Sequence, residues 1–222
     1  PMAIRRLMAI GLCLVLAVVS MSAALLTQAA EGAEQSEEEV VMPAGLINIK
    51  TVLDFEKTVS NVGSGINYIP VTLEQSNDYA ASGSYSLKLT STGSGGSSPR
   101  LSQVQPAGFS ADFSKAQYLE VSVYNPSAVD YGITWMKIGG VLVDDSKVEI
   151  SYVKNDTWYR VSRYEKNDWE ADFRIPAGYR GAFRVKIGGE GGLALSDTNV
   201  DNFEFAVQEN TAAAGNCIYF DK

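Results

Sequence analysis

Acidic residues occupy alternate positions in the segment VLDFE (52–56), near the start of the strand-rich part of the chain. In an extended strand Leu53 and Phe55 point to one face, so Asp54 and Glu56 point to the other. Two carboxylates on one face are candidate ligands for Ca²⁺, which takes roughly six to eight oxygen ligands from carboxylates and loop carbonyls. The alternative is that Asp54 and Glu56 are ordinary solvent-facing acids on an edge strand.

The residue types that most hydrolytic centres need are largely missing. The chain has no His, which excludes Ser-His-Asp and Cys-His catalysis and removes the commonest nitrogen ligand of zinc. A glycosidase needs instead two carboxylates about 5–10 Å apart. Asp144, Asp145, Glu170 and Glu190 supply carboxylates, but such acids more often form a solvated surface. We therefore predict no catalytic residue, and we keep a glycosidase or lyase with a carboxylate pair as an alternative.

Aromatic residues are numerous, with 11 Tyr and 3 Trp. A flat ring offers an apolar surface to the C–H face of a sugar, and nearby guanidinium and carboxylate groups bind the hydroxyls. The candidates on polar strand faces or in loops are Tyr131, Trp135, Trp169 and Tyr179, with Arg163 and Arg174 as polar partners. Trp135 fits the core and the surface equally well, whereas Trp158 in TWYRV is interpreted as a packing residue.

The N-terminal segment, residues 1–29, has the pattern of an export signal. Two arginines precede an apolar run (7–26), and Thr27 and Ala29 stand at the small-residue positions of a cleavage site. An uncleaved membrane anchor is the alternative, because about twenty apolar residues can span a bilayer. Either interpretation places the rest of the protein outside the cytoplasm, secreted or at the cell surface.

The remainder of the chain has a uniform strand pattern. Residues 30–45 are acidic and without periodicity, which indicates a linker. Over residues 46–222, apolar and polar residues alternate in short segments such as YLEVSVY (118–124) and FRVKI (183–187), separated by Gly, Pro, Asn, Asp and Ser. Half-buried strands of this kind form antiparallel sheets. We therefore predict one all-β domain. The net charge of −8 argues against a nucleic-acid partner, because binding to phosphates needs a basic face.

Several motifs in a fixed order carry a family resemblance. They include LDFE (53–56), YAASGSYSLKLT (79–90), DFRIPAGYRGAFRVKI (172–187), VDNFEFAV (200–207) and CIYFDK (217–222). This order resembles the jelly-roll carbohydrate-binding modules and galactose-binding-like domains of secreted bacterial proteins. The resemblance implies an antiparallel two-sheet β-sandwich, a jelly roll, over residues 46–222.

The same resemblance implies a structural calcium ion. In the family pattern, a first-strand acid, carbonyls of the loop before the G-x-Y-S-L strand and a last-strand Asp surround one ion. In this chain these positions are Glu56, with Asp54 beside it, the backbone near Ser82 and Gly83, and Asp221.

We thus expect a non-catalytic module that binds polysaccharide or cell-wall glycan on an aromatic-lined sheet face. A structural or adhesive spacer without a sugar site is the main alternative. Membrane contact is expected only through an uncleaved N-terminal segment. Because the sequence begins with Pro before Met2 and stops at Lys222, directly after a strand pattern, we also expect it to be part of a longer chain with further domains.

Overall fold

The computed structural model describes residues 38–40, 50–56, 63–64, 71–92, 100–105, 109–144, 147–161, 164–166, 169–171, 173–209 and 213–222. These residues fall in one compact unit, Glu37–Lys222. The predicted export signal (1–29) lies outside the described residues, as does most of the predicted linker. No helix within the described ranges is long and apolar enough to cross a membrane.

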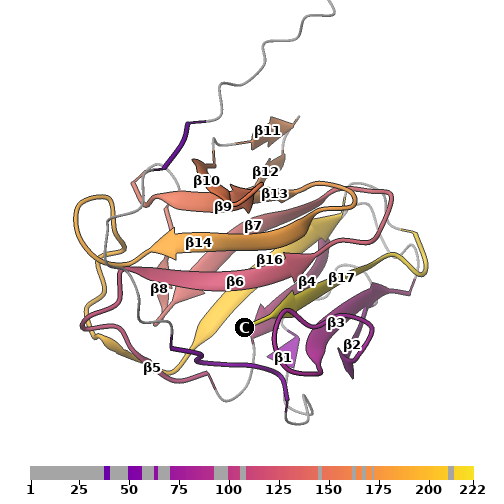
Figure 1. The fold of residues 1–222 in the computed structure, drawn as a ribbon, viewed down its shortest axis with the longest axis horizontal. Coiled ribbons are helices and arrows are strands. Elements are labelled where there is room, and N and C mark those ends of the chain that lie inside the picture. The colour runs from indigo at the N-terminus through magenta and orange to yellow at the C-terminus, as the bar shows by residue number, and fades with distance from the viewer. Residues whose placement is uncertain are drawn as a thin grey trace, which may run out of the picture. The chain divides into compact units, whose positions relative to one another are not determined.

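Two large antiparallel sheets make up the unit (Figure 1). Sheet A has seven strands in the order β10 (Thr157–Arg160), β9 (Ile150–Lys154), β14 (Arg180–Lys186), β6 (Tyr118–Tyr124), β17 (Cys217–Asp221), β3 (Ser86–Ser91) and β2 (Val71–Ser76). Sheet B has the order β1 (Gly63–Ser64), β4 (Arg100–Gln105), β16 (Phe203–Glu209), β7 (Tyr131–Ile138) and β13 (Phe173–Ile175), with β8 (Val141–Leu142) also paired to β7.

Two small two-stranded sheets complete the described elements. They are β11 (Tyr164–Lys166) with β12 (Trp169–Ala171), and β5 (Ala111–Asp112) with β15 (Asn199–Val200). Residues 38–40, inside the predicted linker, lie against the edge of sheet A. There the amide N–H of Val40 donates to Trp158 O at 2.8 Å, and that of Arg160 donates to Glu38 O at 2.7 Å.

The chain passes repeatedly from one sheet to the other. Strands β3, β6, β9, β14 and β17 belong to sheet A, and the intervening β4, β7, β13 and β16 belong to sheet B. As a result, the inner strands of each sheet pair with strands that are distant in sequence. This crossing pattern is the topology of a jelly roll, so the predicted all-β, two-sheet sandwich is confirmed.

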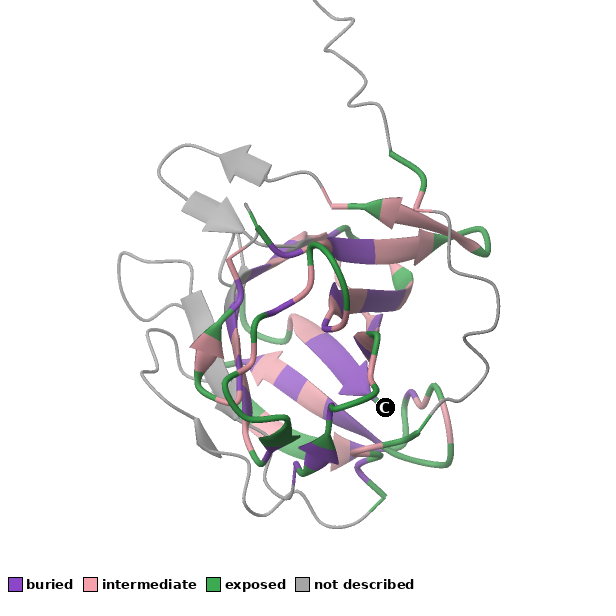
Figure 2. Cartoon of the chain, turned by 90° about the vertical axis from the view of Figure 1, so that its left-hand side faces the viewer, coloured by how far each residue is buried: buried purple, intermediate pink, exposed green. Residues whose placement is uncertain are grey.

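The core lies between the two sheets, and the alternation of the sequence determines which side chains enter it. In β6, Leu119, Val121 and Val123 are buried while the residues between them are half-buried. Figure 2 shows buried and half-buried bands alternating along strands of the unit. The rings of Phe205 in sheet B and Phe220 in sheet A lie 4.9 Å apart across the interface. Each buried side chain of this size contributes about 1.5–3 kcal/mol of hydrophobic stabilisation, which is why the polar residues take the opposite face.

The last strand, β17, is an inner strand of sheet A and pairs with both β3 and β6. Ile218 and Phe220 are buried in the core, and the alternate residues Tyr219 and Asp221 belong to the opposite face of the sheet. We refer to this face, which points away from sheet B, as the outer face of sheet A. It carries the aromatic and charged residues described next.

Candidate functional site

A row of aromatic and charged side chains crosses the outer face of sheet A. The strand register places Arg180 of β14 opposite Tyr124 of β6, and Tyr124 opposite Tyr219 of β17. Tyr219 is in turn opposite Lys88 of β3, and Lys88 is opposite Glu74 of β2. Cross-strand neighbours on one face lie close enough for their side chains to touch. The row therefore forms a continuous surface across five strands.

Three tyrosine rings pack together at the centre of this row. The ring centroids of Tyr79 and Tyr124 are 5.2 Å apart, those of Tyr79 and Tyr219 5.9 Å, and those of Tyr124 and Tyr219 5.8 Å. Tyr79 and Tyr219 are only 6% and 5% exposed, so these two rings mostly cover one another. Burial raises the pKa of Tyr219 to about 12, which keeps its hydroxyl protonated as a hydrogen-bond donor near Asp78.

A second group of residues comes from β6, β14 and β10, and it reaches across β9, which lies between β14 and β10. The Arg184 guanidinium lies over the Trp158 ring, 3.7 Å from its centroid, and 5.6 Å from the centroid of Tyr118. Its Nε donates to Glu120 Oε2 at 2.7 Å. Stacking and ion pairing together fix the guanidinium plane. Trp158, interpreted from sequence as a packing residue, thus packs on the outer face and supports a charged group there.

The aromatic residues that sequence analysis selected are placed differently. Tyr131 begins β7 and is 1% exposed, so the expectation that it lies on a polar face or in a loop is wrong. The Tyr179 hydroxyl is 2.9 Å from Val153 O and 3.0 Å from Ala182 O, and burial raises its pKa to about 12. The Arg174 guanidinium is held by a short ion pair with Asp130, to which its Nε also donates at 2.8 Å.

The other selected residues are described only in part. Trp135 lies in β7 and Trp169 in β12, where the structure describes the backbone, and Arg163 lies outside the described residues. Trp135 and Arg174 belong to strands of sheet B and Trp169 to the small β11–β12 sheet. Trp135, Arg174 and Trp169 are therefore not part of sheet A. The signal in the sequence that could have identified the outer face is the set of polar positions that alternate with apolar ones in YLEVSVY (β6) and CIYFD (β17).

Two of the three predicted metal ligands converge on one loop. Glu56 Oε1 accepts hydrogen bonds from the amides of Ser84 and Tyr85, at 2.7 and 2.9 Å. Asp221 Oδ2 accepts from the amides of Ala81 and Ser82, at 2.8 and 3.1 Å. Two carboxylates that lie far apart in the sequence thus hold both ends of the 81–85 loop. Asp54 instead accepts from the amide of Glu56, at 3.2 Å.

The carboxylate of Asp221 is in an environment that is unusual for an acid. The residue is 1% exposed, and burial raises the pKa of its carboxyl above the ordinary value of 3.8. The amides of Ser82 and Ala81 oppose that rise, and the negative charge of Glu56 adds to it. Within the described ranges, no group of three or more His, Cys, Asp or Glu side chains is close enough to hold a metal ion. A cation here would have Glu56, Asp221 and loop carbonyls as ligands.

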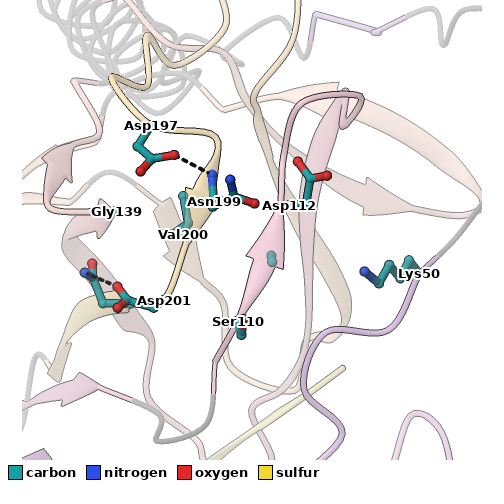
Figure 3. Close-up of a pocket in the computed structure, with 10 residues that line it drawn as sticks. Lys50, Ser110, Asp112, Gly139, Asp197, Asn199, Val200 and Asp201 are labelled. Carbon is teal, nitrogen blue, oxygen red and sulfur yellow. Dashed lines mark hydrogen bonds between the residues drawn. The ribbon is translucent and has the colours of Figure 1, made fainter.

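A separate polar cavity of about 610 Å³ opens beside β5 and β15 (Figure 3). Three aspartates, two asparagines and Lys50 line it, and none of its ten lining residues is aromatic. Its polar groups close turns: Asp112 Oδ1 accepts from Ser114 N, Asp197 Oδ1 from Asn199 N and Asn202 Oδ1 from Gly140 N, each at 2.9 Å. This cavity lacks a flat apolar surface, so the outer face of sheet A is the better candidate for sugar recognition.

Comparison with known proteins gives similarity to solved structures alone, since no family model and no curated protein matches the chain. The C-terminal family 22 carbohydrate-binding module of Clostridium thermocellum Xyn10B is 12% identical, with 76% of this chain and 86% of that chain covered and a TM-score of 0.34. The CBM22-1 xylan-binding domain of Paenibacillus barcinonensis Xyn10C is 13% identical, with 77% and 88% covered and a TM-score of 0.32.

A third structure was described in connection with the promiscuous specificity of carbohydrate-binding modules from the β-sandwich superfamily. It is 15% identical, with 76% of this chain and 58% of that chain covered and a TM-score of 0.36. All three of these solved structures are described as carbohydrate-binding modules or as a domain that binds xylan.

Proposed function

We propose that this protein is a non-catalytic carbohydrate-binding module that holds a polysaccharide or cell-wall glycan on the outer face of sheet A. The observation that carries the proposal is the surface formed by Trp158, Tyr118, Arg184 and Glu120. A sugar ring offers hydroxyls around its rim and C–H groups on its faces. This surface offers a planar donor in Arg184, an acceptor in Glu120 and aromatic edges beside both.

The geometry favours binding because its polar groups are fixed before a ligand arrives. Arg184 is 18% exposed at its side chain and Glu120 39%, so both reach solvent while the ion pair and the Trp158 ring hold them. Fixing rotamer-rich side chains in advance lowers the entropy lost on binding. The surface is thus a set of oriented hydrogen-bonding groups.

A binding role is favoured over hydrolysis by the state of the acids on this face. Asp221, whose pKa is raised, is 1% exposed and bonded to the 81–85 loop, so it is not accessible to a sugar, and the other acids are ion-paired. Glu120 pairs with Arg184, Glu149 with Lys186 at 3.6 Å, and Asp78 with Lys88 at 2.9 Å. The Lys88 hydrogen bond lowers the pKa of Asp78. A glycosidase acid needs the opposite, a carboxyl whose pKa is raised and which faces the scissile bond.

Isothermal titration against a panel of soluble polysaccharides, with pull-down on insoluble ones, tests the proposal. Trp158→Ala and Arg184→Ala are each expected to weaken binding by about ten-fold or more, because aromatic and charge-assisted contacts contribute about 1–2 kcal/mol each. Lys147→Ala is the matched control, because it removes an exposed cation that pairs with Asp144 outside this face. Unchanged affinity in Arg184→Ala and Trp158→Ala would place the glycan elsewhere.

The spacer alternative has one observation in its favour. The rings of Tyr79 and Tyr219 are almost fully covered, and the Trp158 ring lies under Arg184, so the aromatic surface is largely used within the protein. A folded sample that binds no glycan in the titration panel would support the spacer.

We also propose that Ca²⁺ braces the 81–85 loop through Glu56 and Asp221. The supporting features are the all-oxygen donor set, the deep burial of Asp221 and the convergence of both carboxylates on one loop. Addition of Ca²⁺ to chelator-treated protein is expected to raise the melting temperature, and Asp221→Asn is expected to remove that rise. Identical melting in Ca²⁺ and in chelator would refute the site. Export, as an extracellular module, is the third part of the proposal and is supported by the apolar N-terminal run.

A further inference from the structure

Arg180 differs from the other cations of the outer face in its partners. The others pair with carboxylates: Arg184 with Glu120, Lys88 with Asp78 and Glu74, Lys186 with Glu149 and Arg160 with Glu38. No carboxylate of the described residues forms an ion pair with Arg180. Arg180 is exposed, and its guanidinium lies 5.2 Å from the ring centroid of Tyr79 and 5.7 Å from that of Tyr124.

Three groups of acids lie around Arg180 on this face, and each has partners of its own. The nearest by strand register is the buried Asp221, two strands away, which accepts hydrogen bonds from the amides of Ala81 and Ser82. Neighbouring strands are about 4.8 Å apart, and Lys88 with its acidic partners is three strands away, so the backbones are roughly 14 Å apart. Along β14, Arg184 with its partner Glu120 is four residues away, or roughly 13 Å. Neither ion pair therefore includes the positive charge of Arg180 as a partner.

The two tyrosine rings also orient this charge. A guanidinium that stacks on aromatic rings presents its N–H groups at the rim of the stack, and the rings restrict the rotamers of the long side chain. Arg180 stands in the same row as Tyr124 and Tyr219 and on the same face as Arg184. It is an oriented cation at the edge of the proposed glycan surface, on a protein whose net charge is −8.

We infer that Arg180 selects a carboxylate-bearing polysaccharide, one that contains uronic acid residues, by a bidentate guanidinium–carboxylate contact. The planar fork of an Arg side chain matches the two oxygens of a carboxylate, a match that Lys does not reproduce. This inference rests on the proposed function, because it assigns the class of glycan that the same face binds. A neutral glycan would leave Arg180 without a carboxylate partner among the residues that the structure describes.

The test compares polygalacturonate with the same polymer after complete methyl esterification, which removes the charge and keeps the backbone. The wild-type protein is expected to bind the acid form about ten-fold more tightly, and 0.5 M NaCl is expected to reduce that preference. Arg180→Gln is expected to abolish the preference and Arg180→Lys to retain only a small part of it. Arg160→Gln is the matched control, because it removes a cation of the same face that pairs with Glu38.

The outcomes separate the inference from the proposed function. Equal affinity of the wild-type protein for both polymers, or an unchanged preference in Arg180→Gln, would overturn the inference and leave glycan binding intact. Loss of preference in Arg160→Gln to the same extent as in Arg180→Gln would show a general charge effect and would also overturn it. Binding to inorganic phosphate or sulfated polymer with equal preference would show an anion site without carboxylate selection. Absence of binding to any glycan would reject the proposed function itself.

Discussion

The substitution Gly83→Ala tests whether the Glu56 carboxylate holds the 81–85 loop in place. Gly83 has a φ of +72°, a conformation that costs a residue with a side chain about 1–2 kcal/mol. A Cβ at this position would also collide with the Glu56 carboxylate, which accepts the amides of Ser84 and Tyr85. Gly83→Ala therefore strains the backbone and displaces the group that the loop is bonded to.

The two effects can be separated with a second glycine. Gly178 has a φ of +74°, and a Cβ added there would meet nothing within 4 Å, so Gly178→Ala carries the backbone cost alone. Glu56 is exposed, so water replaces part of what its two hydrogen bonds contribute, and we assign about 1–2 kcal/mol to the pair. Gly83→Ala is thus expected to lower the free energy of unfolding by about 2–4 kcal/mol, and Gly178→Ala by about 1–2 kcal/mol.

Urea denaturation in the presence of a chelator, followed by Trp fluorescence, measures both variants without a contribution from bound metal. The double variant Glu56→Ala/Gly83→Ala completes the cycle, because without the carboxylate the substitution at Gly83 should cost only the backbone term. If Gly83→Ala and Gly178→Ala destabilise equally, to within about 0.5 kcal/mol, the carboxylate does not hold the loop.

Two further predictions concern buried polar groups. Because the pKa of Asp221 is raised above 3.8 in the folded protein, the native state binds this proton more tightly than the unfolded chain does. The contribution of Asp221 to stability is therefore fully present below pH 3.8 and is lost as the pH rises through the raised pKa. Denaturation midpoints across that interval should show this loss in the wild type and not in Asp221→Asn, and parallel curves would contradict it. Tyr179→Phe should lower the free energy of unfolding by about 1 kcal/mol. The substitution removes the hydroxyl that can donate a hydrogen bond to Val153 O or Ala182 O. Tyr85→Phe, at an exposed position, should have no effect, and an equal loss in both would refute the role of the buried hydroxyl.

The faces of most strands could be predicted from the sequence, because a half-buried strand must alternate. The alternation assigns Ile218 and Phe220 to the core and Tyr219 to the opposite face, as the structure has them. Tyr131 follows a turn signal, which predicts a polar face or a loop, yet it is buried on the same face as Ile133, as alternation from Ile133 requires. Further along β7, Met136 is buried, three residues after Ile133 and not two. The side chains that point into the core therefore shift by one position where the β7–β16 register shifts. A bulge of this kind adds one residue to a strand, and only the partner strand reveals it.

The candidate binding face could be predicted only in part, for a related reason. The polar positions of Tyr118, Tyr124 and Tyr219 follow from their own strands. Their assembly with Arg180 and Trp158 depends on which strands are neighbours, and those pairings join segments far apart in the chain. The convergence of Glu56 and Asp221 on one loop came from the family resemblance and not from spacing. The calcium ion itself stays a prediction.

The inner position of β17 has a consequence for how the protein is made. β17 follows both of its neighbours in the sequence, so the ribosome completes β3 and β6 before the strand that joins them exists. Until then, each of those two strands presents an unpaired row of amides and carbonyls, the feature that leads strands to pair with other molecules. An extended peptide of matching alternation can occupy such a slot by β-strand addition. The nascent chain is therefore an acceptor for a donor strand, from its own C-terminal segment or from that of a second copy.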